Sequence, residues 1–312
     1  MLLLKYSSIQ TGFFVYMQKP NFTDLPKSFA QQVEILSERG MGISTDTEHR
    51  LSHTNYYRLG EFWKFYRIQS SKDFTDGTTF DTIWEDYRND RRLRLLIMDA
   101  IERIEVSFKT KLANFLATKS NTPYPHLNPV YLKCSSSNDE YKRFLQKTEE
   151  ETKRSTEEFV KIFFKTYDET NLPIWMLVEV LSFGTVSRYY ELLTSDIKKA
   201  IAKEYNLDKY VFGKWIHFLS IVRNMCCHHA RFWRRKFGWK PPVLNRNVYE
   251  SWNPSMNFTE VYGLMCILKY FMCIIRPNSR WHNDVDSFIA SVPNVENLGF
   301  PNDWDDFVPW KR

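Results

Sequence analysis

The amino-acid sequence predicts an all-α protein, and three observations support this fold class. Glycine (10 residues) and proline (13 residues) are sparse for a chain of 312 residues. Alternating apolar and polar strand patterns are scarce. Apolar residues instead recur at helical steps of three and four along one long stretch: Leu93, Ile97, Ile101, Ile104, Phe108, Leu112 and Phe115.

The first half of the chain contains three predicted helices. The first lies within 26–40, between a proline and a glycine that mark its start and stop. The second covers 55–67, and its aromatic residues on almost every face predict that it is largely buried. Residues 74–80 predict a turn or a short hairpin. The third and longest helix runs over about 80–119, which is on the order of 60 Å at 1.5 Å per residue.

The second half continues in the same pattern. Prolines and a serine run predict a loop over 120–138, and Ser195 is a suitable N-cap for the helix that follows it. The remaining predicted helices are 139–167, a segment from Pro173 that ends at Gly184, shorter helices within 185–205, then 209–235, 256–275 and 279–291.

Domain boundaries are only weakly marked, because composition changes little along the chain. We expect a poorly ordered N-terminal extension (1–25), an N-terminal helical accessory region (26–78), one large helical domain (79–292) and an acidic, irregular C-terminal tail (293–312).

Bulk composition restricts the functional class. A net charge of +6 and a pI near 8.9 lean toward an anionic partner. The five cysteines form no disulfide framework, which favours a reducing cytoplasm. A signal peptide is not expected, because polar residues interrupt the N-terminal apolar stretch and no small-residue cleavage site follows it. A membrane span is not expected either, because the other apolar stretch is short and contains Lys269.

The segment "SIVRNMCCHHARFWRRKFGWK", residues 220–240, concentrates chemically active side chains. Its two cysteines and two histidines are zinc-ligand types, but they are consecutive. Successive side chains on a helix diverge by about 100°, so a tetrahedral site is disfavoured and no metal is expected. Thiolate chemistry has no separate support, and Cys226 and Cys227 fit ordinary core positions.

A second interpretation of this segment is catalytic. Asn224 and His228 are four residues apart on one helix face, and the long side chain of Arg223 can reach the same place. An imidazole can transfer a proton, and a guanidinium can stabilise a phosphate transition state, so RNA cleavage without a metal or other cofactor is feasible. The second proton transfer then calls for another copy of the motif, which predicts a homodimer. A buried hydrogen-bond network remains the alternative.

Basic and aromatic residues interleave after the motif, as in single-stranded RNA binders. The alternative is a solvated helix end with its aromatic rings in the core. The candidate RNA-binding residues are His229, Arg231, Trp233, Arg234, Arg235, Lys236 and Lys240. A further basic cluster of Arg91, Arg92 and Arg94 fits either surface ion pairs or RNA backbone contacts, and we favour surface pairs.

"RNMCCHHARFW" resembles the R-N-x-x-x-H signature of the HEPN ribonuclease superfamily, and more narrowly the Abi-like (AbiD/AbiF) abortive-infection family. "NYYRLGEFWKFYR", "DYRNDRRLRLLIMDAIERIEVSFKT" and "LPIWMLVEVLSFGTVSRYYELL" precede it in the family's order. The resemblance covers about residues 26–245. Arg223 and His228 match the catalytic pair, Asn224 the polar position beside the arginine, and His229 the second histidine.

The resemblance implies a HEPN-type helical bundle and a metal-independent endoribonuclease that leaves 2′,3′-cyclic phosphate and 5′-hydroxyl ends. It also implies a toxin of anti-phage defence, with a small structured non-coding RNA as a further partner. The competing hypothesis is an RNA-binding module that binds such an RNA without cutting it.

Overall fold

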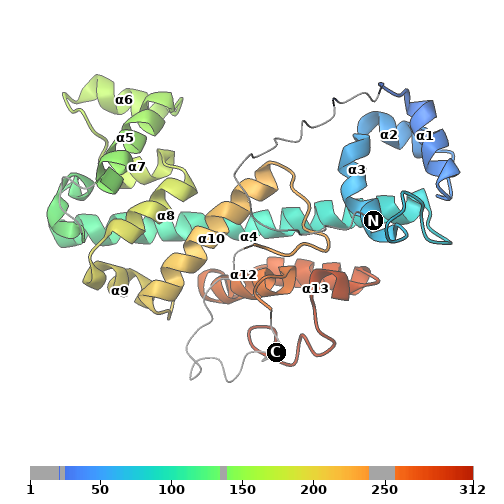
Figure 1. Ribbon diagram of the computed structural model, residues 1–312. Helices are drawn as coiled ribbons and strands as arrows, with labels where there is room; N and C mark the ends of the chain where they lie inside the picture. The colour runs from blue at the N-terminus through green and yellow to red at the C-terminus, as the bar shows by residue number, and fades with distance from the viewer. Residues whose placement is uncertain (1–20, 22–24, 134–138, 239–256, 312) are drawn as a thin grey trace, which may run out of the picture. The chain divides into compact units, whose positions relative to one another are not determined.

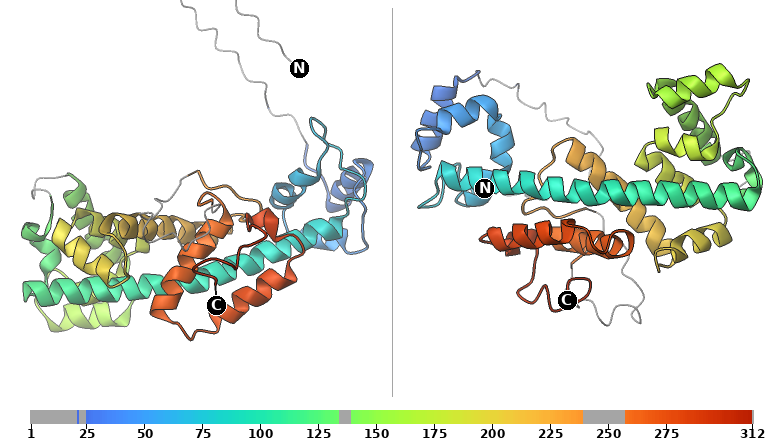
Figure 2. Two further views of the ribbon diagram at one scale, coloured as in Figure 1. Left: turned by 90° about the horizontal axis from the view of Figure 1, so that it is seen from below. Right: turned by 180° about the vertical axis from the view of Figure 1, so that it is seen from behind.

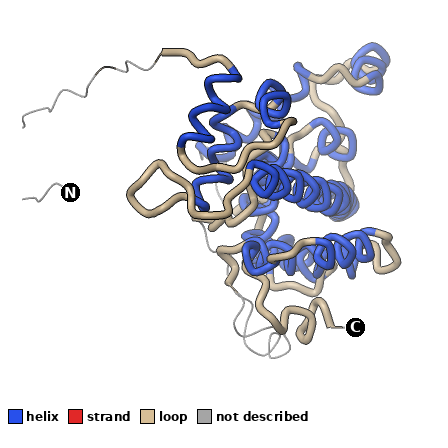
Figure 3. Tube along the Cα trace, turned by 90° about the vertical axis from the view of Figure 1, so that its right-hand side faces the viewer, coloured by secondary structure: helices blue, strands red, loops and turns tan. Residues whose placement is uncertain are grey.

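Figure 1 shows the chain as a computed structural model that describes residues 21, 25–133, 139–238 and 257–311. Helices joined by turns and loops make up these residues, and the only β-pairings among them are isolated bridges (Figure 3). The predicted all-α fold class is therefore confirmed. The predicted N-terminal extension lies almost entirely outside the described residues.

The chain divides into two compact units, each described here by itself. The first comprises the described part of Met1–Arg58 together with Tyr66–Phe80, and the second comprises Leu59–Phe65 and Asp81–Arg312. The boundaries predicted from the sequence stay predictions.

The first unit contains α1 (Phe29–Glu38), α2 (Thr47–His53) and the start of α3 (Tyr56–Trp63). A capping box starts α1, because the Ser28 hydroxyl accepts from the Gln31 backbone and the Gln31 side chain accepts from the Ser28 backbone. Gly40 takes a φ of +84° just after the helix, as the sequence predicted for its stop. Residues 74–80 form turns with isolated bridges and no hairpin.

The predicted helix 55–67 is shorter and less buried than expected. It ends as α3 at Trp63, and a 3₁₀ turn (Lys64–Tyr66) follows. Leu59, Phe62 and Trp63 are buried, but Tyr57 is 76% exposed. The pattern was uninformative here because aromatic residues on every face do not indicate which face packs.

The second unit is built around α4 (Phe80–Ser120), the long helix in Figure 1. The predicted apolar stripe forms its buried face from Leu93 to Leu112, whereas Phe115 is half-buried and Leu116 takes the next core position. The Phe108 ring lies 5.9 Å from that of Tyr190 and 5.5 Å from that of Phe212, so three helices meet at this point.

The other helices of this unit follow α4 in the chain. They are α5 (Asp139–Arg154), α6 (Glu158–Thr166), α7 (Ile174–Val180), α8 (Phe183–Leu192), α9 (Ser195–Lys203), α10 (Lys209–Cys227), α12 (Val261–Ile275) and α13 (Trp281–Ser291). Figure 2 shows α12 and α13 beside α4 in both views. The Trp281 indole donates to the Leu96 carbonyl at 2.8 Å, which ties α13 to α4.

Three predicted boundaries between α5 and α9 are wrong. The segment 139–167 is two helices, with a break at Ser155 and Thr156, whose hydroxyls compete with helical hydrogen bonding. The helix after Pro173 ends before Ser182, which caps α8, so Gly184 lies inside α8. The N-cap of α9 is Thr194, one residue before the predicted Ser195.

The C-terminal tail is irregular, as predicted, apart from a 3₁₀ turn (Val295–Leu298), but aromatic residues anchor it. Phe300 and Trp310 are buried, and the Trp310 indole donates to the Cys266 sulfur at 3.1 Å. Within the described ranges, no helix is both long and apolar enough to cross a bilayer.

Candidate functional site

The R-N-x-x-x-H motif lies at the C-terminal end of α10. The helix starts where the Asp208 carboxylate accepts from the Tyr210 backbone at 2.7 Å, and it packs against α8 and α9 (Figure 1). It ends at Cys227, so the predicted extent of 209–235 is wrong by two turns. The motif's histidine therefore follows the last helical residue.

A Schellman motif ends α10. His229 has a φ of +56°, its backbone N–H donates to Cys226 at 3.0 Å, and the Ala230 N–H donates to Met225 at 2.9 Å. Glycine or asparagine usually occupies the left-handed position. A histidine there carries no obvious stop signal, so the sequence alone gave no reason to end the helix.

The motif side chains lie at the C-terminal end of α10, in its last turn and its C-cap. Asn224 and His228 are both exposed, and the His228 N–H donates to the Asn224 carbonyl at 3.0 Å, which keeps their four-residue helical relation. The Arg223 side chain is 38% exposed, and its Nη1 lies 3.5 Å from the Asn224 Oδ1. Arg223 and Asn224 are thus neighbours in the last turn, and His228 follows one turn after Asn224 as the C-cap residue.

A partly buried ion pair on α4 lies beside the Arg223 side chain. The Glu105 carboxylate pairs with Lys109 Nζ at 2.7 Å, and its other oxygen lies 3.9 Å from the Arg223 Nε. That Nε is buried and has no hydrogen-bond partner in the described part of the chain. Opposite charge at this distance orients the guanidinium without fully satisfying it. Sequence reasoning missed this role for Glu105, because a Glu–Lys pair four residues apart is typical of a helix surface.

Asp90 of α4 holds the chain that follows the motif. Its side chain is 0% exposed, and one carboxylate oxygen accepts from the backbone N–H groups of Phe232 and Trp233, both at 2.7 Å. The other oxygen pairs with Arg94, whose Nη1 also lies 3.4 Å from the Ala230 carbonyl. Burial raises the pKa of the Asp90 carboxyl, while Arg94 and the backbone donors oppose that rise.

The basic cluster predicted on α4 is not one surface. Arg91 and Arg92 are exposed, and Arg92 lies over the Phe288 ring at 5.4 Å. Arg94 is 8% exposed and bound to Asp90. The expected surface ion pair is therefore wrong for Arg94, because its guanidinium is buried and paired with the buried Asp90 carboxylate. Sequence distance hid this link between α4 and the loop after α10.

The residues of the basic, aromatic run divide between core and surface. Phe232 (0% exposed) and Trp233 (2%) are buried, so the Trp233 ring offers no face to a base. Arg231 lies 4.9 Å and Arg234 5.1 Å from the Phe65 ring, in cation–π geometry. Burial lowers the pKa of Arg231, and nearby Glu61 opposes that change.

The other predicted RNA-binding residues are closer to solvent. Arg235 is half-buried and donates to the Arg231 carbonyl at 3.0 Å. The Lys236 side chain is 80% exposed and lies 3.7 Å from Glu260, and His229 is exposed. Lys240 lies outside the described residues. Of the predicted RNA-binding residues that the structure describes, His229 and Lys236 are thus the exposed members.

The cysteines between the motif residues contribute little chemistry. Cys226 is buried, and burial raises the pKa of its thiol to about 12, which disfavours the reactive thiolate. Cys227 is exposed. Over the described ranges, no group of three or more histidine, cysteine or acidic side chains is placed to hold a metal ion.

Comparison with known proteins identifies the family. The chain has no significant match among curated proteins or among solved structures. The family model described as "Abi-like protein" matches residues 49–234, a span that starts in α2, contains all of α4 to α10 and includes the motif with the loop that Asp90 holds. Because this match covers more than half of the 312 residues, the chain belongs to the Abi-like protein family.

Proposed function

We propose that this Abi-like protein is a metal-independent endoribonuclease of abortive-infection defence, with a HEPN-type catalytic bundle. The observation that supports the proposal is that Arg223, Asn224 and His228 all lie at the C-terminal end of α10, where Asn224 and His228 are exposed and Arg223 is half-buried. The Glu105 carboxylate lies 3.9 Å from the Arg223 Nε, and the His228 side chain is exposed to solvent.

These side chains match the chemistry of RNA cleavage by internal attack. The 2′-hydroxyl oxygen bonds to the adjacent phosphorus, and the bond from phosphorus to the 5′ oxygen breaks. Products are a 2′,3′-cyclic phosphate and a 5′-hydroxyl. His228 takes or gives a proton, Arg223 stabilises the charge on the phosphate oxygens, and Asn224 orients the strand.

His228→Ala is expected to lower the cleavage rate about 10²–10⁴-fold, the usual worth of a positioned proton-transfer group. Purified protein is incubated with single-stranded RNA in EDTA, and product ends are mapped. Arg223→Lys is expected to reduce cleavage too, because an ammonium cannot bind two phosphate oxygens in the planar way of a guanidinium.

Cys227→Ala is the matched control, since Cys227 is exposed on the same turn and has no role in the chemistry. Cleavage that is equal in wild type and His228→Ala would overturn the proposal. RNA that binds tightly but is never cut would favour the alternative, an RNA-binding module. Sequencing the RNA that co-purifies with His228→Ala tests the proposed small non-coding RNA partner.

A further inference from the structure

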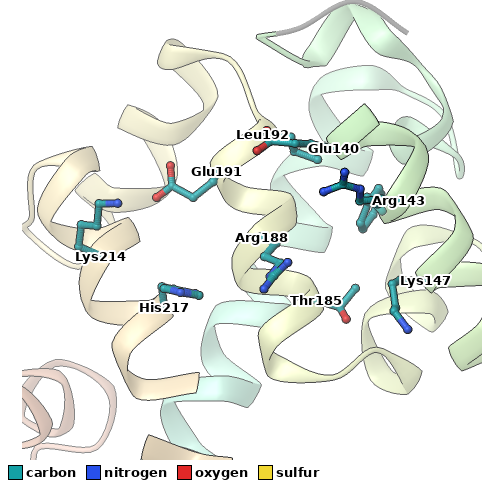
Figure 4. Close-up of a pocket in the computed structure, with 10 residues that line it drawn as sticks. Glu140, Arg143, Lys147, Thr185, Arg188, Glu191, Leu192, Lys214 and His217 are labelled. Atoms are coloured by element: carbon teal, nitrogen blue, oxygen red, sulfur yellow. The ribbon is translucent and has the colours of Figure 1, made fainter. Parts of the chain in front are cut away.

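A separate pocket of about 340 Å³ lies between α5, α8 and α10 (Figure 4). Four cationic side chains line it: Arg143 and Lys147 from α5, Arg188 from α8 and Lys214 from α10. His217 points into the same space toward Arg188. All three helices belong to the second unit.

Within the described chain, three of these cations lack an acidic partner. Lys147 bonds Glu150 at 2.6 Å, and the lining residue Glu191 is itself bonded to Lys198 at 2.5 Å. Arg143, Arg188 and Lys214, by contrast, form no ion pair with any carboxylate in the described residues. A second carboxylate, that of Glu140, also lines the pocket, so four cationic side chains face two carboxylates there. This excess of positive charge raises the local potential and favours a bound anion.

The pKa of His217 is consistent with that potential. Burial of the imidazole lowers its pKa, the positive charges of Arg188 and Lys214 lower it further, and the Glu191 carboxylate opposes that change.

The pocket and the motif lie on the same face of α10. Steps of four, three, four, three and four residues connect six side chains that are not buried: Tyr210, Lys214, His217, Ile221, Asn224 and His228. Such steps keep side chains on one helix face. His217 and His228 are eleven positions apart, which is about 16 Å along the axis at 1.5 Å per residue.

The pocket suits phosphate better than a base. Apart from His217, Phe144 is the one aromatic side chain in the described lining of the pocket. It is 4% exposed, and its ring stacks on that of Tyr189 with a centroid distance of 4.3 Å. That ring therefore offers no free face for stacking, while the guanidinium and ammonium groups suit phosphate oxygens.

We propose that this pocket is a phosphate subsite for the single-stranded RNA whose scissile phosphate lies at the motif. The proposal rests on the proposed function. The pocket holds backbone phosphates of the same strand about 16 Å from His228, independently of base sequence, and it contributes affinity rather than chemistry.

The test is RNA binding by protein that cannot cut. Arg143→Gln with Arg188→Gln is introduced into the His228→Ala protein, and binding of RNA of about twelve nucleotides is measured across salt concentrations. The slope of log affinity against log salt is expected to become less negative by about 0.7 for each phosphate that the variant no longer binds. The change is expected for RNAs of different sequence alike.

Two control variants sharpen the result. Arg143→Lys with Arg188→Lys keeps the charges and is expected to keep most of the slope. Arg280→Gln with Lys119→Gln removes two charges outside the pocket, and Arg280 is 89% exposed. A slope change no larger in the pocket variant than in this pair would overturn the subsite.

The source of the phosphate is tested separately. Binding of a mononucleotide to the His228→Ala protein is measured with and without the Arg143→Gln and Arg188→Gln changes. If these changes weaken mononucleotide binding but leave the salt slope of RNA binding unchanged, the proposal is also overturned. Absence of RNA cleavage by the wild type would instead contradict the proposed function, and it would not alter the salt slopes of RNA binding that test the pocket. The two failures are therefore distinguishable.

Discussion

His229 ends α10 in a backbone conformation that suits glycine better than histidine. At a φ of +56° the Cβ of an ordinary L-residue crowds the carbonyl oxygen that follows it, at a cost of roughly 1 kcal/mol. The Schellman hydrogen bonds that this conformation allows offset the strain.

We expect His229→Gly to raise the free energy of unfolding by about 0.5–1 kcal/mol, because glycine removes the steric strain. His229→Val is expected to lower it by at least as much, since a β-branched side chain is poorly tolerated at positive φ. Urea denaturation measures both. Equal shifts in the two variants would contradict a backbone origin.

His126 is a buried histidine, 1% exposed, in the 3₁₀ turn Pro125–Leu127 after α4. Its Nδ1 has no hydrogen-bond partner in the described residues, and burial lowers its pKa from 6.5 to about 4. The unfolded chain therefore binds a proton more readily than the folded one. This side chain's contribution to stability is complete above about pH 6.5 and is lost as the pH falls toward 4.

Between pH 7 and pH 5, His126 is expected to remove about 2 kcal/mol of stability. His126→Phe keeps a ring beside Tyr124, whose centroid lies 6.3 Å away, and cannot bind the proton. Its free energy of unfolding should fall less over this range. Urea denaturation of the wild type and of His126→Phe at pH 7 and pH 5 measures this difference. Equal decreases in the free energy of unfolding of both proteins would show that other groups dominate.

Helix packing explains why α10 carries a glycine in its interior. A Cβ at Gly213 would lie 2.9 Å from the buried Tyr190 ring and closer still to the Glu191 carboxylate, both on α8. The glycine thus permits the close approach of α10 to α8. The pocket, which α8 and α10 line together, depends on that approach.

We expect Gly213→Ala to lower the free energy of unfolding by about 1–3 kcal/mol through overpacking. Gly184→Ala is the matched variant, because its nearest contact would be at 3.9 Å and it lies in the first turn of α8. That change should raise stability by about 0.4–1 kcal/mol. Thermal or urea denaturation of the pair decides, and similar losses in both would refute the packing argument.

For the whole molecule, the proposed chemistry requires a second proton-transfer group, and a second copy of the chain is our proposed source. Mixing wild-type protein with an equal amount of His228→Ala should then leave about a quarter of the pairs as wild-type homodimers after random exchange. We expect cleavage to fall toward that fraction. Activity that stays at half would show that each chain acts alone.

Local sequence signals predicted the elements best where one physical effect dominates. The apolar stripe from Leu93 to Leu112 fixes both the existence and the buried face of α4, because the 3.6-residue period leaves few alternatives. The breaks at Ser155 and Ser182 were missed because serine hydroxyls compete there with an otherwise continuous helical pattern. The Ser155 hydroxyl accepts from the Glu157 backbone N–H at 3.3 Å, and the Ser182 hydroxyl caps α8.

The sequence by itself determined the all-α class, the family and the spacing of Arg223, Asn224 and His228, since these depend on local periodicity and on a short motif. Only the tertiary structure showed that Glu105 faces Arg223, that Asp90 binds the loop at Phe232 and Trp233, and that α5 and α8 bring Arg143 and Arg188 to α10. These partners lie tens of residues to more than a hundred apart. Packing of α4, α5, α8 and α10 brings them together, and no local pattern records that packing.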